Sequence, residues 1–184
     1  MFRFKIDDDI ELRLLEEQHA EEVFSLLDRN RSHLESELTW LDDQFSSAID
    51  AKEYIKAGLE RLAAKNGLRA GIWLRGDLAG VVSLHNLIWA DRKASLGYWL
   101  GASFQGQGLV TKACRILIDH SFGKLKLNRL EIQCDPENER SWKVAESLGF
   151  TKEGVLRQSW WSRDHFVDQV VYGLIASEWQ GETS

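Results

Sequence analysis

Proline, cysteine and methionine are scarce in this chain of 184 residues, which contains one proline, two cysteines and one methionine. Neither Cys114 nor Cys134 has a histidine at zinc-like spacing, so we expect no disulfide framework and no metal site. We interpret both as buried small apolar residues. The sequence also lacks repeats, low-complexity tracts and Pro-rich or Ser-rich linkers, which predicts a single domain over residues 1–184.

Long apolar runs are absent as well. No stretch reaches the roughly 18 apolar residues that a membrane-spanning helix needs, and residues 1–15 mix charges into their apolar positions, unlike a signal peptide. We therefore expect a cytoplasmic protein that does not bind membranes. The net charge of −6 argues against nucleic-acid binding as the main role; it suits a cationic substrate or simply a solvated acidic surface.

The residues that are present indicate a folded globular protein. Hydrophobic residues make up 43% and charged residues 28% of the chain. The eight tryptophans offer aromatic surface for a groove or an interface, although core packing is the default for such side chains.

Apolar periodicity predicts an α+β fold with a mixed, mostly antiparallel sheet. Helical spacing recurs near residues 16–30, 51–63, 111–125 and 138–148. Strand patterns occur near residues 10–15, 68–74, 78–88, 94–100, 129–134, 152–161 and 166–177, and those from 68 to 100 suggest an antiparallel meander. We therefore expect about seven strands flanked by about four helices. Residues 30–47 have no clean period and suit an irregular wall around a site.

One glycine-containing segment, Gln105-Gly106-Gln107-Gly108-Leu109-Val110-Thr111, joins a predicted strand to a predicted helix. Its glycines let the backbone point several N–H groups one way, and the helix N-terminus adds partial positive charge. Such a loop binds a phosphate or pyrophosphate without basic side chains, although it also fits a simple tight turn. The segment matches neither the P-loop nor the dinucleotide-binding fingerprint.

A second segment, Asp135–Ser141, opens the next predicted helix one strand later. Asn138 and Ser141 are three residues apart, which on a helix places an amide and a hydroxyl on one face. Catalysis is one interpretation of this pair. The other is structural, with Asn138 capping the helix and Ser141 solvated.

Together these segments resemble the GNAT superfamily of N-acetyltransferases. Residues 105–110 are similar to its acetyl-coenzyme A signature, Gln/Arg-x-x-Gly-x-Gly/Ala, with Val110 at the last position. Residues 135–150 are similar to the following helix in the bacterial ribosomal-protein N-terminal acetyltransferase branch. Shorter matches at residues 12–15, 30–31, 40–41 and 96–100 and in the last two strands extend the resemblance over nearly the whole chain.

The resemblance implies a sheet splayed at its fourth and fifth strands and acetyl-CoA as cosubstrate, with no metal. The expected diphosphate ligands are backbone amides of Gln105, Gly106, Gln107, Gly108, Val110 and Thr111. The pantetheine arm is expected on the backbone from Tyr98 to Gly101, which includes Trp99 and Leu100, and on Asn138. The Leu100 N–H is expected to polarise the thioester carbonyl, and the Ser141 hydroxyl to protonate the departing thiolate.

One position departs from the branch in a way that concerns the acceptor. Several members carry a glutamate proposed as general base where this chain has Trp160. Glu35, Asp42, Asp43, Asp164 and His165 are other candidates, among which the sequence does not choose and each of which also fits a surface role. Without a strong base, an α-amine of pKa about 7.7 to 8.0 is an easier acceptor than lysine, of pKa about 10.4.

We therefore expect acetyl transfer to a protein N-terminus, that of a ribosomal protein, which enters along residues 30–45 and the strands around Trp160. Two alternatives stay open. The acceptor is a small-molecule amine such as a polyamine, an aminoglycoside or an amino acid, or the chain is a CoA-binding module without turnover. The sequence also leaves open whether the protein is a homo-oligomer.

Overall fold

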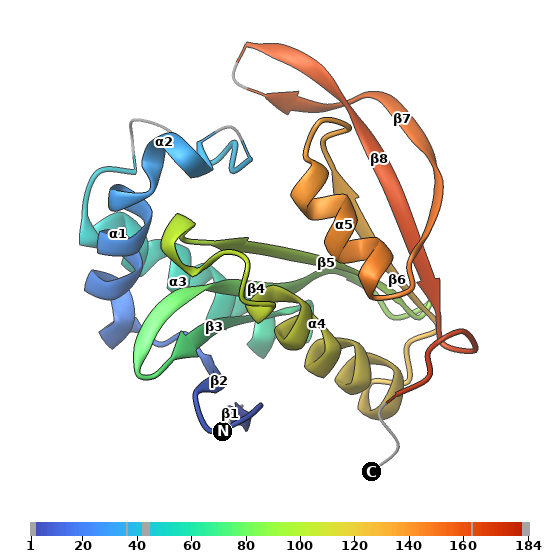
Figure 1. Cartoon of the computed structure of the whole chain (residues 1–184), viewed down its shortest axis with the longest axis horizontal. Helices are drawn as coiled ribbons and strands as arrows, with labels where there is room; N and C mark the ends of the chain where they lie inside the picture. The colour runs from blue at the N-terminus through green and yellow to red at the C-terminus, as the bar shows by residue number, and fades with distance from the viewer. Residues whose placement is uncertain (1–2, 36, 42–44, 163, 182–184) are drawn as a thin grey trace.

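A computed structural model describes residues 3–35, 37–41, 45–162 and 164–181. Within these ranges the strands form one eight-stranded sheet of order β1-β2-β3-β4-β5-β6-β8-β7 (Figure 1). The strands are β1 (Arg3–Lys5), β2 (Ile10–Leu14), β3 (Leu68–Leu74), β4 (Asp77–Ile88), β5 (Lys93–Leu100), β6 (Arg129–Cys134), β7 (Thr151–Ser162) and β8 (His165–Ile175). The α-helices are α1 (Ala20–Arg29), α2 (Arg31–Leu34), α3 (Ala48–Ala63), α4 (Leu109–Asp119) and α5 (Glu139–Ser147).

The pairing of the strands confirms the expected α+β fold and the meander. β3, β4 and β5 pair antiparallel in chain order. β5 and β6 run parallel and pair only where Lys93–Ser95 meets Arg129–Glu131. Beyond Ser95 the two strands diverge and leave a V-shaped gap in the sheet. The splay therefore lies at the predicted fourth and fifth strands.

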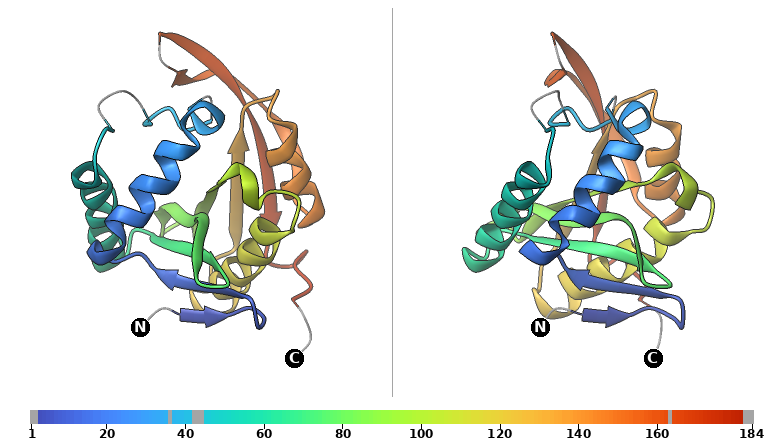
Figure 2. Two further views of the ribbon diagram at one scale, coloured as in Figure 1. Left: turned by 60° about the vertical axis from the view of Figure 1, so that its left-hand side comes forward. Right: turned by 90° about the vertical axis from the view of Figure 1, so that its left-hand side faces the viewer.

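Helices cover both faces of the sheet (Figure 2). On one face α1 and α3 bury Val23, Leu27 and Ile55 in one core cluster. On the other face Ala113 and Leu117 of α4 lie in a second cluster. Fully burying a Leu or Ile side chain contributes about 1.5–3 kcal/mol to stability. These two clusters therefore hold the helices on the two faces of the sheet.

The expected seven strands and four helices were each one too few for the described residues. β1 is three residues long and carries two charges, so no alternation marks it, and it forms by pairing with β2. α2 is a single turn inside the aperiodic segment 30–47, where packing rather than periodicity decides. α4 begins two residues before the expected Thr111, and a π-helical turn, His120–Lys124, replaces its expected continuation toward residue 125.

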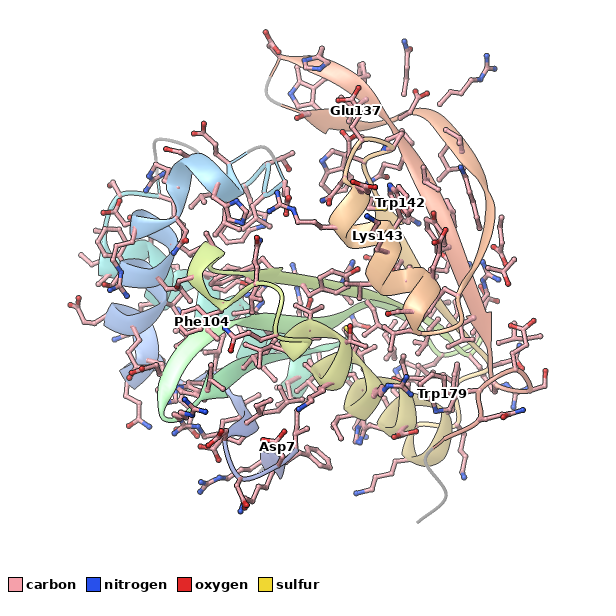
Figure 3. The ribbon with its side chains drawn as sticks, in the orientation of Figure 1. Asp7, Phe104, Glu137, Trp142, Lys143 and Trp179 are labelled. Atoms are coloured by element: carbon pink, nitrogen blue, oxygen red, sulfur yellow. The ribbon has the colours of Figure 1, made fainter. Side chains whose placement is uncertain are left out.

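The C-terminal part of the chain contacts the rest of the fold through the β7–β8 hairpin and through Trp179. β7 and β8 form a hairpin that extends beyond the rest of the sheet (Figure 1). Trp179 lies beside the end of α4 (Figure 3), where its indole N–H donates to the Asp119 carboxylate at 2.7 Å. In the described part of the chain, no helix combines the length and the apolar character that a membrane crossing requires.

Candidate active site

A groove of about 1620 Å³ runs through the V-shaped gap between β5 and β6. On the α5 side it is lined by the loop before α4 and by the start of α5. On the α3 side it is lined by α3, by residues 37–40 and by parts of β3, β4, β7 and β8. The gap thus connects the two faces of the sheet, and a reaction there can bring two ligands together from opposite sides.

The loop before α4 leaves open space in front of the helix N-terminus. Gly106 and Gly108 adopt left-handed φ angles of 74° and 71°. A Cβ atom built on either glycine has no heavy atom within 4 Å. The first N–H groups of α4 have no partner within the helix, and together with its dipole they favour an anion. The loop therefore fits the diphosphate that the sequence predicts for it.

Val110 and Gln107 qualify that prediction. The Val110 side chain packs against the buried cluster under α4, so it leaves its backbone free to face a ligand. Of the residues predicted to contact the cosubstrate, Gly101 does not line the groove, and neither does Gln107. The Gln107 side chain is exposed and lies 3.5 Å from the Ser103 carbonyl, which leaves only its backbone for a ligand.

Gln105 joins the two sides of the groove mouth through its side chain. Its Oε1 accepts a hydrogen bond from Arg140 of α5 at 2.9 Å, and its Nε2 lies 2.7 Å from Nε2 of His33 on α2. Arg140 also pairs with Glu37 at 3.6 Å. Periodicity could not show this network, because it links three segments that are distant in sequence.

The end of β5 directs one backbone donor into the gap. The Gly101 N–H donates to the Ala79 carbonyl on the β4 side at 2.9 Å. Because consecutive N–H groups of an extended strand point to opposite edges, the Leu100 N–H points toward the gap, where β6 has diverged. The Trp99 side chain instead packs on the α3 side and donates to Tyr54 Oη at 3.3 Å. Trp99 pairs with Val81, so by the same alternation its N–H points toward β4, and Trp99 offers neither its backbone N–H nor its indole N–H to a ligand in the gap.

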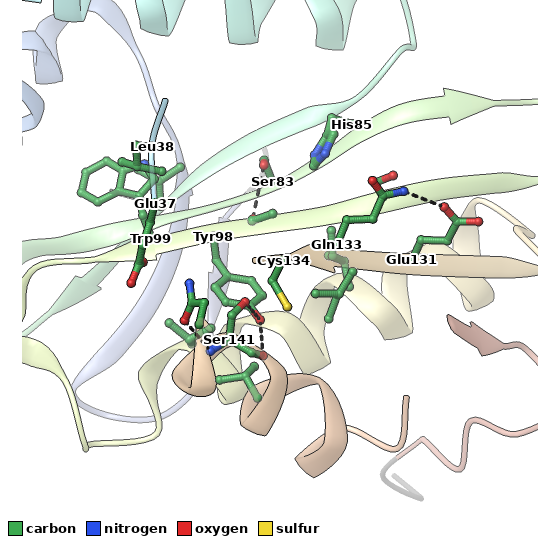
Figure 4. Close-up of a pocket in the computed structure, with 18 of the residues that line it drawn as sticks. Glu37, Leu38, Ser83, His85, Tyr98, Trp99, Glu131, Gln133, Cys134 and Ser141 are labelled. Atoms are coloured by element: carbon green, nitrogen blue, oxygen red, sulfur yellow. Dashed lines mark hydrogen bonds between the residues drawn. The ribbon is translucent and has the colours of Figure 1, made fainter. Parts of the chain in front are cut away.

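Ser141 lies on the first turn of α5 and contacts a tyrosine across the gap (Figure 4). Tyr98 Oη donates to the Ser141 carbonyl at 3.0 Å and lies 3.1 Å from Ser141 Oγ. Burial raises the pKa of Tyr98 far above its usual value, so the phenol keeps its proton at neutral pH. Burial also raises the pKa of the neighbouring Cys134 thiol. Ser141 thus lies beside two groups, the Tyr98 phenol and the Cys134 thiol, that stay neutral at physiological pH.

Asn138 caps α5, as the structural interpretation expected. Its Oδ1 accepts a hydrogen bond from the Ser141 N–H at 3.0 Å, which satisfies one of the free donors of the first turn. The side-chain NH2 of Asn138 is not used by this cap. The capping bond also fixes the backbone of Ser141, so Asn138 positions the hydroxyl beside the gap.

Aromatic side chains form the wall of the groove on the α3 side. Trp40 stacks on Tyr54 with ring centroids 4.7 Å apart, and Phe45 packs against both at an edge. The Trp160 indole N–H donates to Thr39 Oγ1 at 3.2 Å, so β7 meets the aperiodic segment across the groove. Among the described residues, the two parts of the predicted acceptor wall are therefore in contact.

Every carboxylate in the described part of the groove already has a donor. These carboxylates belong to Glu37, Asp50, Glu131, Asp135 and Asp168. The donors are Arg140 for Glu37 (3.6 Å), the Ser47 hydroxyl for Asp50 (2.7 Å), Arg129 for Glu131 (2.9 Å), the Glu137 N–H for Asp135 (2.8 Å) and the Gln158 N–H for Asp168 (2.8 Å). Each of these carboxylates therefore has part of its acceptor capacity engaged within the protein.

The base candidates taken from sequence lie elsewhere. Asp164 and His165 are at the tip of the β7–β8 hairpin, 2.8 Å from each other, and neither lines the groove. Glu35 does not line it either. Asp42 and Asp43 lie outside the described residues. Sequence reasoning missed Tyr98 as a side-chain contributor, although a phenol between Leu96 and Leu100 on the apolar face of a strand needs a hydrogen-bond partner.

Two curated relatives resemble the chain over nearly its full length. It is 37% identical over 182 residues to YdaF, a candidate ribosomal N-acetyltransferase of Bacillus subtilis (strain 168), covering 99% of this chain and 100% of that one. It is 31% identical over 175 residues to the ribosomal-protein-serine acetyltransferase of Escherichia coli (strain K12), covering 93% of this chain and 95% of that one.

A solved structure and a family match agree with these relatives. The crystallised ribosomal L7/L12 α-N-protein acetyltransferase RimL, in complex with coenzyme A, superposes with a TM-score of 0.90 at 25% identity over 95% of this chain and 98% of that one. Residues 9–151 match the family described as acetyltransferase (GNAT) domain. This chain belongs to the GNAT family and is an acetyl-CoA-dependent N-acetyltransferase.

Proposed function

We propose that the protein acetylates the α-amine at the N-terminus of a protein, a ribosomal protein in particular, in the cytoplasm. The observation that carries the proposal is that every carboxylate of the described groove is already engaged by a donor within the protein. A site of this kind favours an acceptor that is neutral without help. Near pH 7.5 roughly a quarter or more of α-amines are neutral, but only about a thousandth of lysine side chains.

The only imidazole in the described groove does not change this expectation. Burial, and then the cations of Arg61 and Arg69, lower the pKa of His85 to about 4. His85 is therefore neutral at physiological pH, and it is too weak a base to deprotonate a lysine ammonium. The names of the two curated relatives point to ribosomal acceptors and add independent support.

In the proposed reaction, acetyl-CoA binds on one side of the gap and the acceptor approaches from the other. When bound, acetyl-CoA supplies the acetyl group as a thioester. The backbone from Gln105 to Thr111 holds the diphosphate, and the Leu100 N–H donates to the carbonyl oxygen as negative charge develops on it. The acceptor nitrogen approaches from the α3 side and forms the new C–N bond while the C–S bond breaks. Water takes the proton that this nitrogen releases.

Ser141 gives its proton to the departing sulfur, and Tyr98 supports it. The Tyr98 phenol donates to the Ser141 carbonyl and lies 3.1 Å from Ser141 Oγ, so it holds the hydroxyl in place, and water in the groove returns a proton to Ser141 after the transfer. In this role Tyr98 acts through Ser141 and is a positioning residue rather than the proton donor itself.

Replacing Tyr98 with Phe should therefore lower kcat about fivefold to tenfold, the value of about one hydrogen bond, with the KM for acetyl-CoA changed less than about twofold. Steady-state kinetics measures both constants. The double variant Tyr98→Phe with Ser141→Ala should be no slower than Ser141→Ala alone, because the phenol then has no hydroxyl to serve. Additive losses would show that Tyr98 acts independently of Ser141.

A ribosomal-protein extract tests the choice of acceptor. The enzyme and acetyl-CoA are incubated with the extract, and new acetyl groups are mapped by mass spectrometry. We expect acetylation of one or a few protein N-termini. Modification confined to lysine side chains, or seen only when small amines are supplied, would contradict the N-terminal assignment. It would still be consistent with acetyl transfer. No CoA release with any amine would leave a CoA-binding module without turnover.

A further inference from the structure

Two arginines form a positively charged corner at the α3 side of the groove. Arg61 projects from α3 and Arg69 from β3, and both line the groove. Arg61 is exposed, whereas Arg69 is half-buried. The net charge of the whole chain is −6, so this corner opposes the overall sign of the molecule.

The Arg69 guanidinium has no carboxylate partner in the described part of the chain. It lies 3.7 Å from the centre of the Tyr54 ring and donates a short hydrogen bond to the Tyr54 carbonyl. Burial lowers the pKa of Arg69, the nearby Tyr54 phenol raises it in part, and the Arg61 cation lowers it; no carboxylate is among these influences. Other arginines on the sheet are paired, for example Arg129 with Glu131 and Glu153.

A charge removed from water without a partner of opposite sign costs free energy. The Tyr54 carbonyl and ring compensate only part of this cost, because neither carries a negative charge. Arg69 lines a groove that a ligand can enter. A guanidinium fork binds a carboxylate by two parallel hydrogen bonds.

The register of the sheet relates this corner to the reaction centre. Arg69 pairs with Ser83, and Ser83 pairs with Gly97 on β5, so the three residues form one row across the sheet. The Ser83 hydroxyl donates to the Gly97 carbonyl at 3.3 Å, and the His85 ring lies beside Gly97. Two strand spacings, about 10 Å, separate β3 from β5, and Gly97 lies three residues, about another 10 Å, from Leu100 along β5, so the Cα atoms of Arg69 and Leu100 are about 14 Å apart.

We propose that Arg69, assisted by Arg61, forms an anion subsite that binds an acidic side chain of the acceptor. The Arg69 side chain covers part of this distance, and an extended peptide covers the remaining roughly 7–10 Å in two or three residues, which places the acidic side chain at the second or third position of the acceptor. The subsite rests on the proposed transfer to an N-terminal α-amine and adds a sequence preference to it. Long-range attraction to an acidic protein would favour basic peptides, so the opposite preference must come from this corner.

Matched peptides test the subsite. Each has a free N-terminus and an amidated C-terminus, and members of a pair differ only by Glu or Gln at the second or third residue. For the wild-type enzyme, kcat/KM should be at least about tenfold higher for the Glu peptide, the effect expected of one charge-assisted contact. In Arg69→Gln this ratio should fall to about one through a higher KM for the Glu peptide, with the KM for acetyl-CoA unchanged. Arg69→Lys should keep part of the preference.

Two further variants separate the subsite from general effects. Arg61→Gln changes an exposed residue, so the fold is expected to stay intact, and it should reduce the preference about twofold to threefold. Arg157→Gln removes an exposed arginine of β7 that does not line the groove, and the preference should stay unchanged. If circular dichroism shows that Arg69→Gln does not fold, the test uses Arg69→Lys and Arg61→Gln instead. A reduced Glu preference in both variants supports the subsite, and an unchanged preference in both refutes it.

A wild-type ratio near one, or a preference for Gln that survives in Arg69→Gln, overturns the subsite. If only small amines are acetylated, the N-terminal assignment fails, and binding of the same peptide pair to the CoA-loaded protein, measured by calorimetry, tests the subsite separately. If no acceptor is turned over, calorimetry of the peptide pair on the CoA-loaded protein gives the same ratio as dissociation constants. In each arm a Glu preference that depends on Arg69 supports the proposal, and its absence refutes it.

Discussion

Substitution of Gly108 by Asp is expected to weaken acetyl-CoA binding about 100-fold to 1000-fold. Gly108 precedes the first turn of α4, and a side chain there enters the open space in front of the helix N-terminus. A carboxylate within about 4–5 Å of a phosphate oxygen costs about 3–4 kcal/mol at an effective dielectric constant near 20. Equilibrium binding of acetyl-CoA to the purified variant measures the loss.

Gly108→Asn is the matched control. Gly108 has a φ of 71°, in the left-handed region that Asn and Asp tolerate better than other residues with a side chain. The Asn and Asp variants therefore carry similar backbone strain. Asn adds the bulk without the charge and should weaken binding much less, about tenfold. Equal losses in the two variants would mean that space, not charge, governs this position. Unchanged affinity in a folded Gly108→Asp variant would remove the diphosphate from this loop.

Replacing Ser141 with Ala should lower kcat about 100-fold, while the KM for acetyl-CoA changes less than about threefold. General acid catalysis contributes about 100-fold to 10,000-fold, and a group that acts mainly in the transition state affects kcat rather than ground-state binding. The expected loss lies at the lower end, because water in the open groove can protonate the thiolate in part. Initial rates at saturating acceptor measure it.

Ser147→Ala on the same helix provides the comparison. The Ser147 hydroxyl donates to the Val144 carbonyl at 2.8 Å and does not line the groove, so its loss should leave kcat unchanged. A Ser141→Ala variant with wild-type kcat would return Ser141 to a structural role in the first turn of α5. A raised KM with unchanged kcat would make it a binding residue only.

The parts of the fold and site that follow local rules could be predicted from the sequence. The loop before α4 depends on two glycines and a helix start, and the conformation of such a segment is set largely by its own residues. The cap at Asn138 is equally local. By contrast, α2 is a single turn within an aperiodic segment, held by the packing of Leu34, and no periodic pattern marks it.

The contacts that depend on sheet register could not be predicted. Tyr98 and Ser141 are 43 residues apart and meet because β5 and α5 face each other across the gap. Arg69 reaches the groove only through its pairing with Ser83 and the position of α3 above it. A charged residue between Leu68 and Ala70 in a buried strand was nevertheless a signal, because a charge in such a place needs a reason.

Tandem mass spectrometry of one acetylated peptide shows directly which nitrogen this enzyme uses. The peptide has a free N-terminus, one internal lysine and an amidated C-terminus, so both kinds of amine compete in the same molecule. With limiting enzyme at pH 7.5, the acetyl group should appear on the α-nitrogen, since far more of that amine is neutral. Acetylation of the lysine Nε while the α-amine stays free would contradict transfer to the protein N-terminus.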